Sequence, residues 1–120
     1  DTLVMEELML GADGIVGGLV DAFPKETVAI YKLVKAGMYK EALEIYRWFL
    51  PLLELDIHPK LVQYIKLAAT QTGICTENVR APRLKLEGKE RETVLATINK
   101  AMATQPALPD YLKLPSAVNV

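Results

Sequence analysis

The sequence is poor in the residues that build disulfides, metal centres and nucleophilic pairs. Among 120 residues there is one cysteine, Cys75, and one histidine, His58. A single cysteine forms no internal disulfide, so the fold does not depend on an oxidising compartment. So few ligands predict no metal site and no metal cofactor. A Cys75–His58 nucleophilic pair is the alternative, but packing and capping at helix boundaries account for both residues.

Long hydrophobic runs and an excess of one charge are also absent. The longest apolar stretches, residues 14–20 and 49–53, are far shorter than the roughly 20 residues of a membrane helix, and the N-terminus lacks a basic signal region. Lysine and arginine number 14 against 15 acidic residues. We therefore expect no membrane partner, no nucleic-acid partner and a cytoplasmic location. With 51% apolar and 24% charged residues, the composition is typical of one globular unit.

Proline, glycine and apolar spacing predict a mostly helical chain. The predicted helices span residues 2–10, 24–36, 39–55, 59–72 and 89–104. In the second helix, Val28, Tyr31 and Val34 recur at roughly helical spacing, and Gly37 ends the helix. Pro51 is expected to bend or interrupt the third helix. Residues 75–87 read as an extended connector, and the tail from Gln105, with prolines at 106, 109 and 115, as an extended arm.

Residues 11–20 are the one predicted strand. Ile15 and Val16 stand among four glycines, which favours a buried strand that comes close to a ligand or another backbone. A lone strand cannot satisfy its backbone hydrogen bonds, and this chain offers no second strand. Either the chain is wholly helical, or it is the C-terminal segment of a larger parallel-sheet domain. Because it opens with Asp1 and not with methionine, we favour the second interpretation.

The charged side chains of the predicted helices have ordinary structural explanations. Glu54 and Asp56 form a carboxylate pair of the kind that solvated helix faces carry. Lys60 and Lys66 lie among alternating polar positions, which favours a surface role over a Schiff-base role. Residues 35–46 are similar to a tetratricopeptide helix hairpin, but no second copy follows, as a repeat architecture requires.

Four stretches carry a resemblance to a known family. They are residues 11–24, 35–43, 64–73 and 79–84. They resemble parts of the dihydrodipicolinate synthase and N-acetylneuraminate lyase family, the class I pyruvate-type aldolases. In this order the parts are the eighth barrel strand with its turn, the hairpin after the eighth barrel helix, a lysine-to-glycine helix and an R-x-P connector.

The resemblance implies an α/β fold. Residues 1–36 would be the end of a (β/α)8 TIM barrel, with a helix, strand 8 and helix 8. Residues 37–120 would be a three-helix C-terminal subdomain with an extended tail.

Arg80 and Arg83 flank Pro82 in the connector and are expected to tie it to helix carboxylates or helix C-termini.

The resemblance also implies a substrate contact without a catalytic residue. The family's Schiff-base lysine and proton-relay tyrosine belong to the sixth and fourth strands, upstream of Asp1, so no catalytic residue is expected in this chain. Val16 matches the position whose backbone carbonyl faces bound pyruvate. Gly17 stands where many members have a serine that reaches the substrate, so that hydroxyl contact is absent here. We name Val16 and Gly17 as the candidate substrate-binding residues.

The implied activity is Schiff-base chemistry on pyruvate or another 2-oxo acid, without a cofactor. The implied partners are the 2-oxo acid, the barrel portion of the same protein, and further copies in a dimer or tetramer. The pattern of residues 55–66 looks less like the lysine-biosynthesis enzymes than like sugar-acid aldolases or dehydratases, or a hydroxyproline-pathway deaminase. The alternative from another class is a stand-alone helical interaction module, in which residues 14–19 are a loop and not a buried strand.

Overall fold

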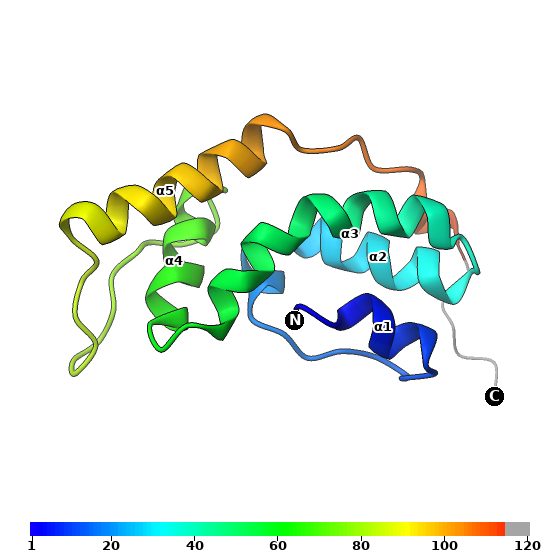
Figure 1. Cartoon of the computed structure of the whole chain (residues 1–120), viewed down its shortest axis with the longest axis horizontal. Coiled ribbons are helices and arrows are strands. Elements are labelled where there is room, and N and C mark those ends of the chain that lie inside the picture. The colour runs from blue at the N-terminus through cyan, green and yellow to red at the C-terminus, as the bar shows by residue number, and fades with distance from the viewer. Residues whose placement is uncertain (115–120) are drawn as a thin grey trace.

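The computed structural model describes residues 1–114, and all of their regular structure is helical (Figure 1). The helices are α1 (Val4–Met9), α2 (Pro24–Lys35), α3 (Tyr39–Leu53), α4 (Leu61–Gln71) and α5 (Gly88–Ala103), with short 3-10 helices η1 (Leu19–Asp21), η2 (Glu54–Ile57) and η3 (Tyr111–Lys113). All five predicted helices are confirmed, with ends within two residues of those expected. No helix of this part of the chain is long and apolar enough to cross a lipid bilayer.

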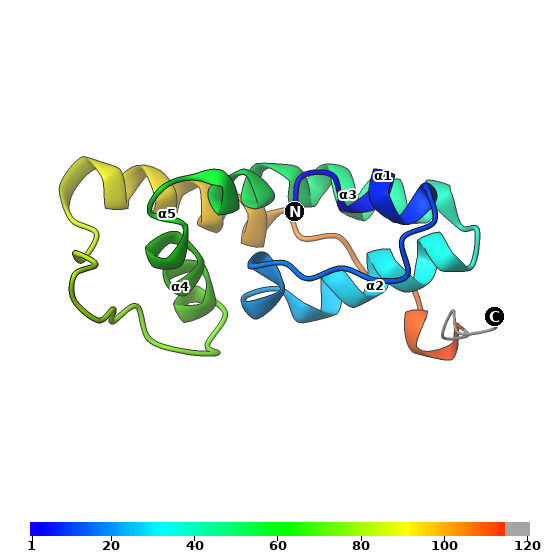
Figure 2. The ribbon, with the colours of Figure 1, turned by 90° about the horizontal axis from the view of Figure 1, so that it is seen from below.

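Helices α2 and α3 form an antiparallel hairpin, and α1 packs against both (Figures 1 and 2). Gly37 ends α2 with a φ of 75°, a left-handed conformation that favours glycine. The Met38 N–H donates to the Leu33 carbonyl and closes the turn. Helix α3 continues through Pro51 to Leu53, so the proline does not interrupt it.

Helices α4 and α5 extend the same core beyond the hairpin. The Trp48 indole N–H of α3 donates to the Ala101 carbonyl of α5 at 2.8 Å. The Trp48 ring stacks on Phe49 with centroids 5.5 Å apart, and Phe49 meets Phe23 edge to face at 5.7 Å. Aromatic contacts of this kind add to the free energy gained by burial. A single apolar cluster therefore joins the hairpin to α5, and the division of the chain at residue 36 stays a prediction.

The tail after α5 returns to the hairpin, as the orange-to-red segment of Figure 1 shows. Gln105 donates from its side-chain amide to the Glu26 carboxylate, and the Lys32 ammonium donates to the Leu114 carbonyl at 3.5 Å. The tail is irregular up to residue 110 and then forms η3. Of the prolines on which the extended arm was predicted, Pro115 lies outside the described residues.

The strand predicted at residues 11–20 does not form. Residues 14–17 have no regular structure, and Leu19–Asp21 is a 3-10 helix. A strand needs neighbouring backbone for its hydrogen bonds, and residues 1–114 contain no second strand. Instead, side chains of α2 hold the preceding turn: the Tyr31 hydroxyl donates to the Asp13 carbonyl at 3.1 Å, and the Lys35 ammonium donates to the Ala12 carbonyl. The described part of the chain is therefore all-helical where an α/β segment was expected.

The apolar residues whose spacing predicted α2 are not all buried. Val34 is buried, but Val28 is 38% exposed and Tyr31 is only half-buried. The buried apolar positions are Ala29, Ile30, Leu33 and Val34. Helical spacing alone does not say which of two overlapping apolar faces meets a neighbour, and here α3 covers the face that holds Ile30 and Leu33.

Candidate substrate-facing segment

Residues 14–18 form an open segment beside α2. The Val16 side chain is fully exposed and Gly17 is half-buried. A hollow of about 300 Å³ lies next to the segment. Its lining residues are Gly14, Ile15, Gly17, Val20, Thr27, Val28 and Tyr31. The two predicted substrate-binding residues thus lie on an accessible part of the backbone, and the outward-facing residues of α2 line the space beside it.

Two carboxylates bind the backbone at the end of this segment. The Asp1 carboxylate accepts hydrogen bonds from the N–H groups of Gly18 at 2.9 Å and Leu19 at 3.1 Å. The Asp56 carboxylate of η2 accepts a second contact from the Gly18 N–H at 3.2 Å. Hydrogen bonds to a charged acceptor are stronger than neutral ones. The segment is therefore open at Val16 and anchored at Gly18.

The anchored end has no room for side chains. A Cβ on Gly17 would overlap the Asp1 carboxylate, and a Cβ on Gly18 would overlap the Asp56 carboxylate and come within 2.5 Å of the Ile65 Cδ1 atom. Ile65 is 7% exposed and belongs to the core, so it cannot move aside easily. Glycine at these positions is thus explained by the approach of two carboxylates and a core side chain.

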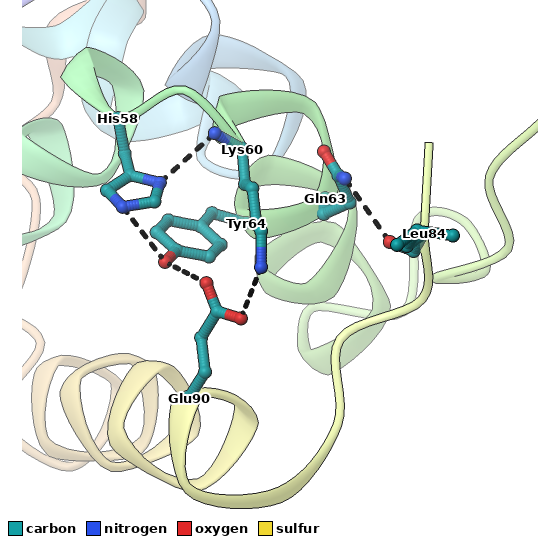
Figure 3. Close-up of polar contacts among 6 residues, drawn as sticks. All are labelled: His58, Lys60, Gln63, Tyr64, Leu84 and Glu90. Carbon is teal, nitrogen blue, oxygen red and sulfur yellow. Dashed lines mark hydrogen bonds and ion pairs between the residues drawn. The ribbon is translucent and has the colours of Figure 1, made fainter. Parts of the chain in front are cut away.

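A polar cluster that sequence reasoning missed connects α4 to α5 (Figure 3). The Tyr64 hydroxyl donates to one oxygen of Glu90 at 2.7 Å, and the Lys60 ammonium binds the other oxygen at 2.6 Å. The His58 ring stacks on Tyr64 with centroids 4.6 Å apart, and its Nδ1 accepts the Lys60 backbone N–H at 3.0 Å. The spacing of Lys60 and Tyr64 places them one helical turn apart, but Glu90 comes from a helix 26 residues away.

The protonation states of this cluster suit a structural contact. Burial, together with the Glu90 carboxylate, raises the pKa of Tyr64 to about 12. Hydrogen bonds from Lys60 and Tyr64 lower the pKa of Glu90. A neutral tyrosine and a charged glutamate form a stable donor and acceptor pair at neutral pH. The cluster therefore joins two helices and offers no activated nucleophile.

The other charged candidates have structural contacts as well. Lys66 donates to the Asn78 carbonyl of the connector, in line with its predicted structural role. Arg80 and Arg83 are exposed, and neither makes an ion pair within residues 1–114. The arginine that ties the connector is Arg91, which binds Glu77 through two nitrogens at 2.9 and 3.2 Å. The prediction that Arg80 and Arg83 tie the connector to helix carboxylates is therefore wrong, because the arginine fork comes from α5 and its acceptor lies in the connector.

No described residues assemble a metal site or a cysteine–histidine pair. Cys75 and His58 lie beyond opposite ends of α4, whose 11 residues span about 16 Å. The Cys75 thiol contacts the carbonyls of Lys66 and Thr76. Within residues 1–114, no three side chains of histidine, cysteine, aspartate or glutamate group closely enough to hold a metal ion.

Comparison with known proteins decides the family. The sequence model described as the dihydrodipicolinate synthetase family matches residues 1–101. This chain belongs to that family. Members of the dihydrodipicolinate synthetase family have a TIM-barrel fold, and the barrel itself is not among the described residues. The family resemblance drawn from the four sequence stretches is thereby confirmed.

Curated relatives of this family carry the name 4-hydroxy-tetrahydrodipicolinate synthase. The protein of Endomicrobium trichonymphae is 30% identical over 91 residues, which are 76% of this chain and 31% of that protein. The protein of Karelsulcia muelleri is 29% identical over 105 residues, which are 88% of this chain and 36% of that protein. The chain therefore spans about a third of the length of these relatives. No solved structure matches it.

Proposed function

We propose that this chain is part of a Schiff-base-forming lyase of the aldolase type that acts on pyruvate or another 2-oxo acid. The observation that carries the proposal is the family match over residues 1–101 in a chain that spans a third of its relatives. In this chemistry a lysine imine withdraws electrons from the carbon that reacts. The lysine is supplied by a barrel portion of the same protein that this sequence does not contain.

In the proposed enzyme, Val16 and Gly17 contribute to the 2-oxo acid site. The backbone carbonyl of Val16 faces the substrate, a role that any side chain permits. Gly17 offers no hydroxyl, which disfavours a long sugar acid as substrate. The open backbone at Val16, the hollow beside it and the anchored Gly18 support this placement.

The distribution of exposed apolar side chains supports a barrel partner. Among residues 1–114, ten large hydrophobic residues are exposed. Half of them fall within residues 1–28, inside the segment 1–36 that the resemblance assigns to the barrel: Leu3, Met9, Leu10, Val16 and Val28. Apolar surface that gathers in one region marks a contact with another protein surface. We infer that the barrel portion covers this region, and that the whole protein is a cytoplasmic homo-oligomer, a dimer or a tetramer.

Two alternatives differ from this proposal in testable ways. A sugar-acid dehydratase or a hydroxyproline-pathway deaminase of the same family stays a prediction. The four matched relatives, all named synthases, favour a condensing enzyme. A stand-alone helical interaction module is supported by the absence of a strand at residues 14–19. The module needs no second protein portion and forms no imine.

Reductive trapping separates the enzyme from the module. The protein from its natural source is incubated with pyruvate and borohydride, and the intact masses of all chains are measured. We expect a reduced pyruvate adduct on a longer or companion chain, and none on a lysine of residues 1–120. Lactate, which lacks the 2-oxo group, is the control ligand. A sample that contains only the folded 13.3 kDa chain and forms no adduct would establish the interaction module instead.

A further inference from the structure

We propose that Asp1 and Asp56 are positioning residues, which hold the backbone at Gly18 so that the Val16 carbonyl keeps its orientation toward the substrate. This inference rests on the proposed function, because it assigns the two carboxylates a task in that same site. The carboxylates come from different places in the fold: Asp1 precedes α1, and Asp56 lies in η2 between α3 and α4.

The backbone between Val16 and Gly18 needs an external restraint. Two consecutive glycines follow Val16, and glycine has more backbone freedom than any other residue. Within residues 1–114 no sheet ladder fixes this segment, so the hydrogen bonds to Asp1 and Asp56 are what restrain it there. An unrestrained Gly17 would let the Val16 carbonyl rotate away from a ligand, and the binding free energy would then include the cost of ordering it.

The two carboxylates supply that restraint from both sides. Gly18 donates its N–H to both, with the nitrogen 2.9 Å from Asp1 Oδ2 and 3.2 Å from Asp56 Oδ2. Asp1 also accepts the Leu19 N–H at 3.1 Å. Two backbone donors thus offset the repulsion between two carboxylates. The contacts cross 17 and 38 residues of sequence, so they join three separate parts of the chain.

The approach of Asp56 depends on the absence of a side chain at Gly18. A Cβ there would overlap the Asp56 carboxylate and the Ile65 Cδ1 atom. Asp56 is half-buried and follows directly on the buried end of α3, where Leu52 and Leu53 are at most 2% exposed. The helical part of the molecule therefore places a carboxylate rigidly against the substrate-facing backbone.

The test measures pyruvate binding in variants of the complete protein that the proposed function requires. The reductive trapping yield is followed against pyruvate concentration for Asp56→Ala, Asp1→Ala and Asp56→Asn. The matched control is Glu54→Ala, since Glu54 is an exposed carboxylate of the same 3-10 helix. Amide hydrogen exchange of Gly18 and Leu19 is measured in parallel as a readout that needs no activity.

We expect Asp56→Ala to raise the half-saturating pyruvate concentration about fivefold, because one hydrogen bond to a carboxylate is lost. The maximal yield of adduct should stay unchanged. Asp1→Ala raises it further, because two N–H contacts are lost. Asp56→Asn keeps an acceptor oxygen and recovers most of the binding. The Gly18 amide exchanges faster in Asp56→Ala, while both amides exchange faster in Asp1→Ala. Glu54→Ala behaves as the unchanged protein.

The outcomes separate this inference from the proposed function. If the unchanged protein forms no adduct, the proposed function fails and this inference fails with it. If the unchanged protein forms the adduct and Asp56→Ala has the same half-saturating concentration, only the positioning role is wrong. If Asp56→Ala does not fold, Asp56→Asn decides. A rise of up to about twofold in the half-saturating pyruvate concentration, with faster exchange of the Gly18 amide, supports the proposal. If neither the concentration nor the exchange rate changes, the proposal is overturned.

Discussion

Tyr64 is a buried phenol whose hydroxyl binds a charged carboxylate, and this arrangement makes the stability of the protein sensitive to alkali. Its pKa is raised to about 12, whereas an unfolded tyrosine ionises near pH 10. The neutral form is therefore favoured in the folded protein. The stabilisation is complete below pH 10 and is lost as the pH rises through about 12.

Replacement of this phenol tests the assignment. We expect Tyr64→Phe to lower the free energy of unfolding by about 1 kcal/mol at neutral pH, because one hydrogen bond to Glu90 is lost. The variant should also lose less stability than the unchanged protein between pH 10 and 12, as measured by urea unfolding. Tyr39→Phe is the control, since Tyr39 is 46% exposed. Equal losses for Tyr64→Phe and the unchanged protein over this pH range would refute the assignment.

Single residues could be predicted from the sequence only where their environment is local. The substrate-binding roles of Val16 and Gly17 rest on the family resemblance and stay predictions. The Asp56–Gly18 contact was not foreseen, because a carboxylate in a charged turn looks the same whether or not a backbone N–H from 38 residues away approaches it. Glu90 was missed for the same reason, since its partners lie on another helix.

Among the elements, the connector between α4 and α5 is irregular yet attached at several points. Arg91 forks onto Glu77, the Gln63 side chain donates to the Leu84 carbonyl at 3.2 Å, and Leu86 is buried at 3% exposure. The guanidinium of Arg91 lowers the pKa of Glu77, so the pair contributes stability above the ordinary carboxyl pKa and loses it as the pH falls through the lowered value.

Removal of the fork should release the connector without unfolding the helices. We expect Arg91→Ala to increase the rate of tryptic cleavage after Arg80 severalfold. The free energy of unfolding should change by less than about 1 kcal/mol, because the ion pair is partly exposed. Lys113→Ala, which removes a well-exposed ion pair with Asp110, is the control. Unchanged cleavage in Arg91→Ala would mean that Gln63 and Leu86 hold the connector by themselves.

Elements with local boundary signals were predicted well, and elements that depend on distant partners were not. Pro24 at the start of α2 and Gly37 beyond its end are short-range signals that act in any context. A strand forms only where a neighbouring strand accepts and donates its backbone hydrogen bonds. Residues 11–20 therefore have a composition typical of a strand but do not form one. The spacing that predicted α2 does not say which apolar positions are buried, and Ile30 is buried while Val28 is exposed.

Within its first 28 residues the molecule exposes five large apolar side chains. We expect the isolated chain at micromolar concentration to bind a hydrophobic dye and to self-associate. The double variant Leu10→Lys and Val16→Lys should reduce both effects, since these side chains are 89% and 104% exposed. Leu112→Lys, at a 71% exposed position in η3, should change neither. Dye fluorescence and sedimentation velocity measure the two effects.

A different thermal behaviour would contradict this expectation. If the isolated chain shows a sharp, cooperative thermal transition as a monomer and binds no dye, the first 28 residues need no cover. The interaction-module alternative would then gain support, although the family membership would stand. At this scale the family was predictable from four short stretches, whereas the barrel is not among the described residues of a chain that spans about a third of its relatives' length.

The contact between Gln105 and Glu26 limits the order in which the protein can fold during synthesis. Glu26 is a carboxylate at 4% exposure in α2, and its side-chain partner stands 79 residues further along the chain. The ribosome releases the N-terminal residues first, so α2 and α3 can pair well before Gln105 emerges. Until then, the Glu26 carboxylate lacks the hydrogen-bond donor that the returning tail supplies. The hairpin should therefore stay loosely closed during translation and tighten only when the returning tail arrives.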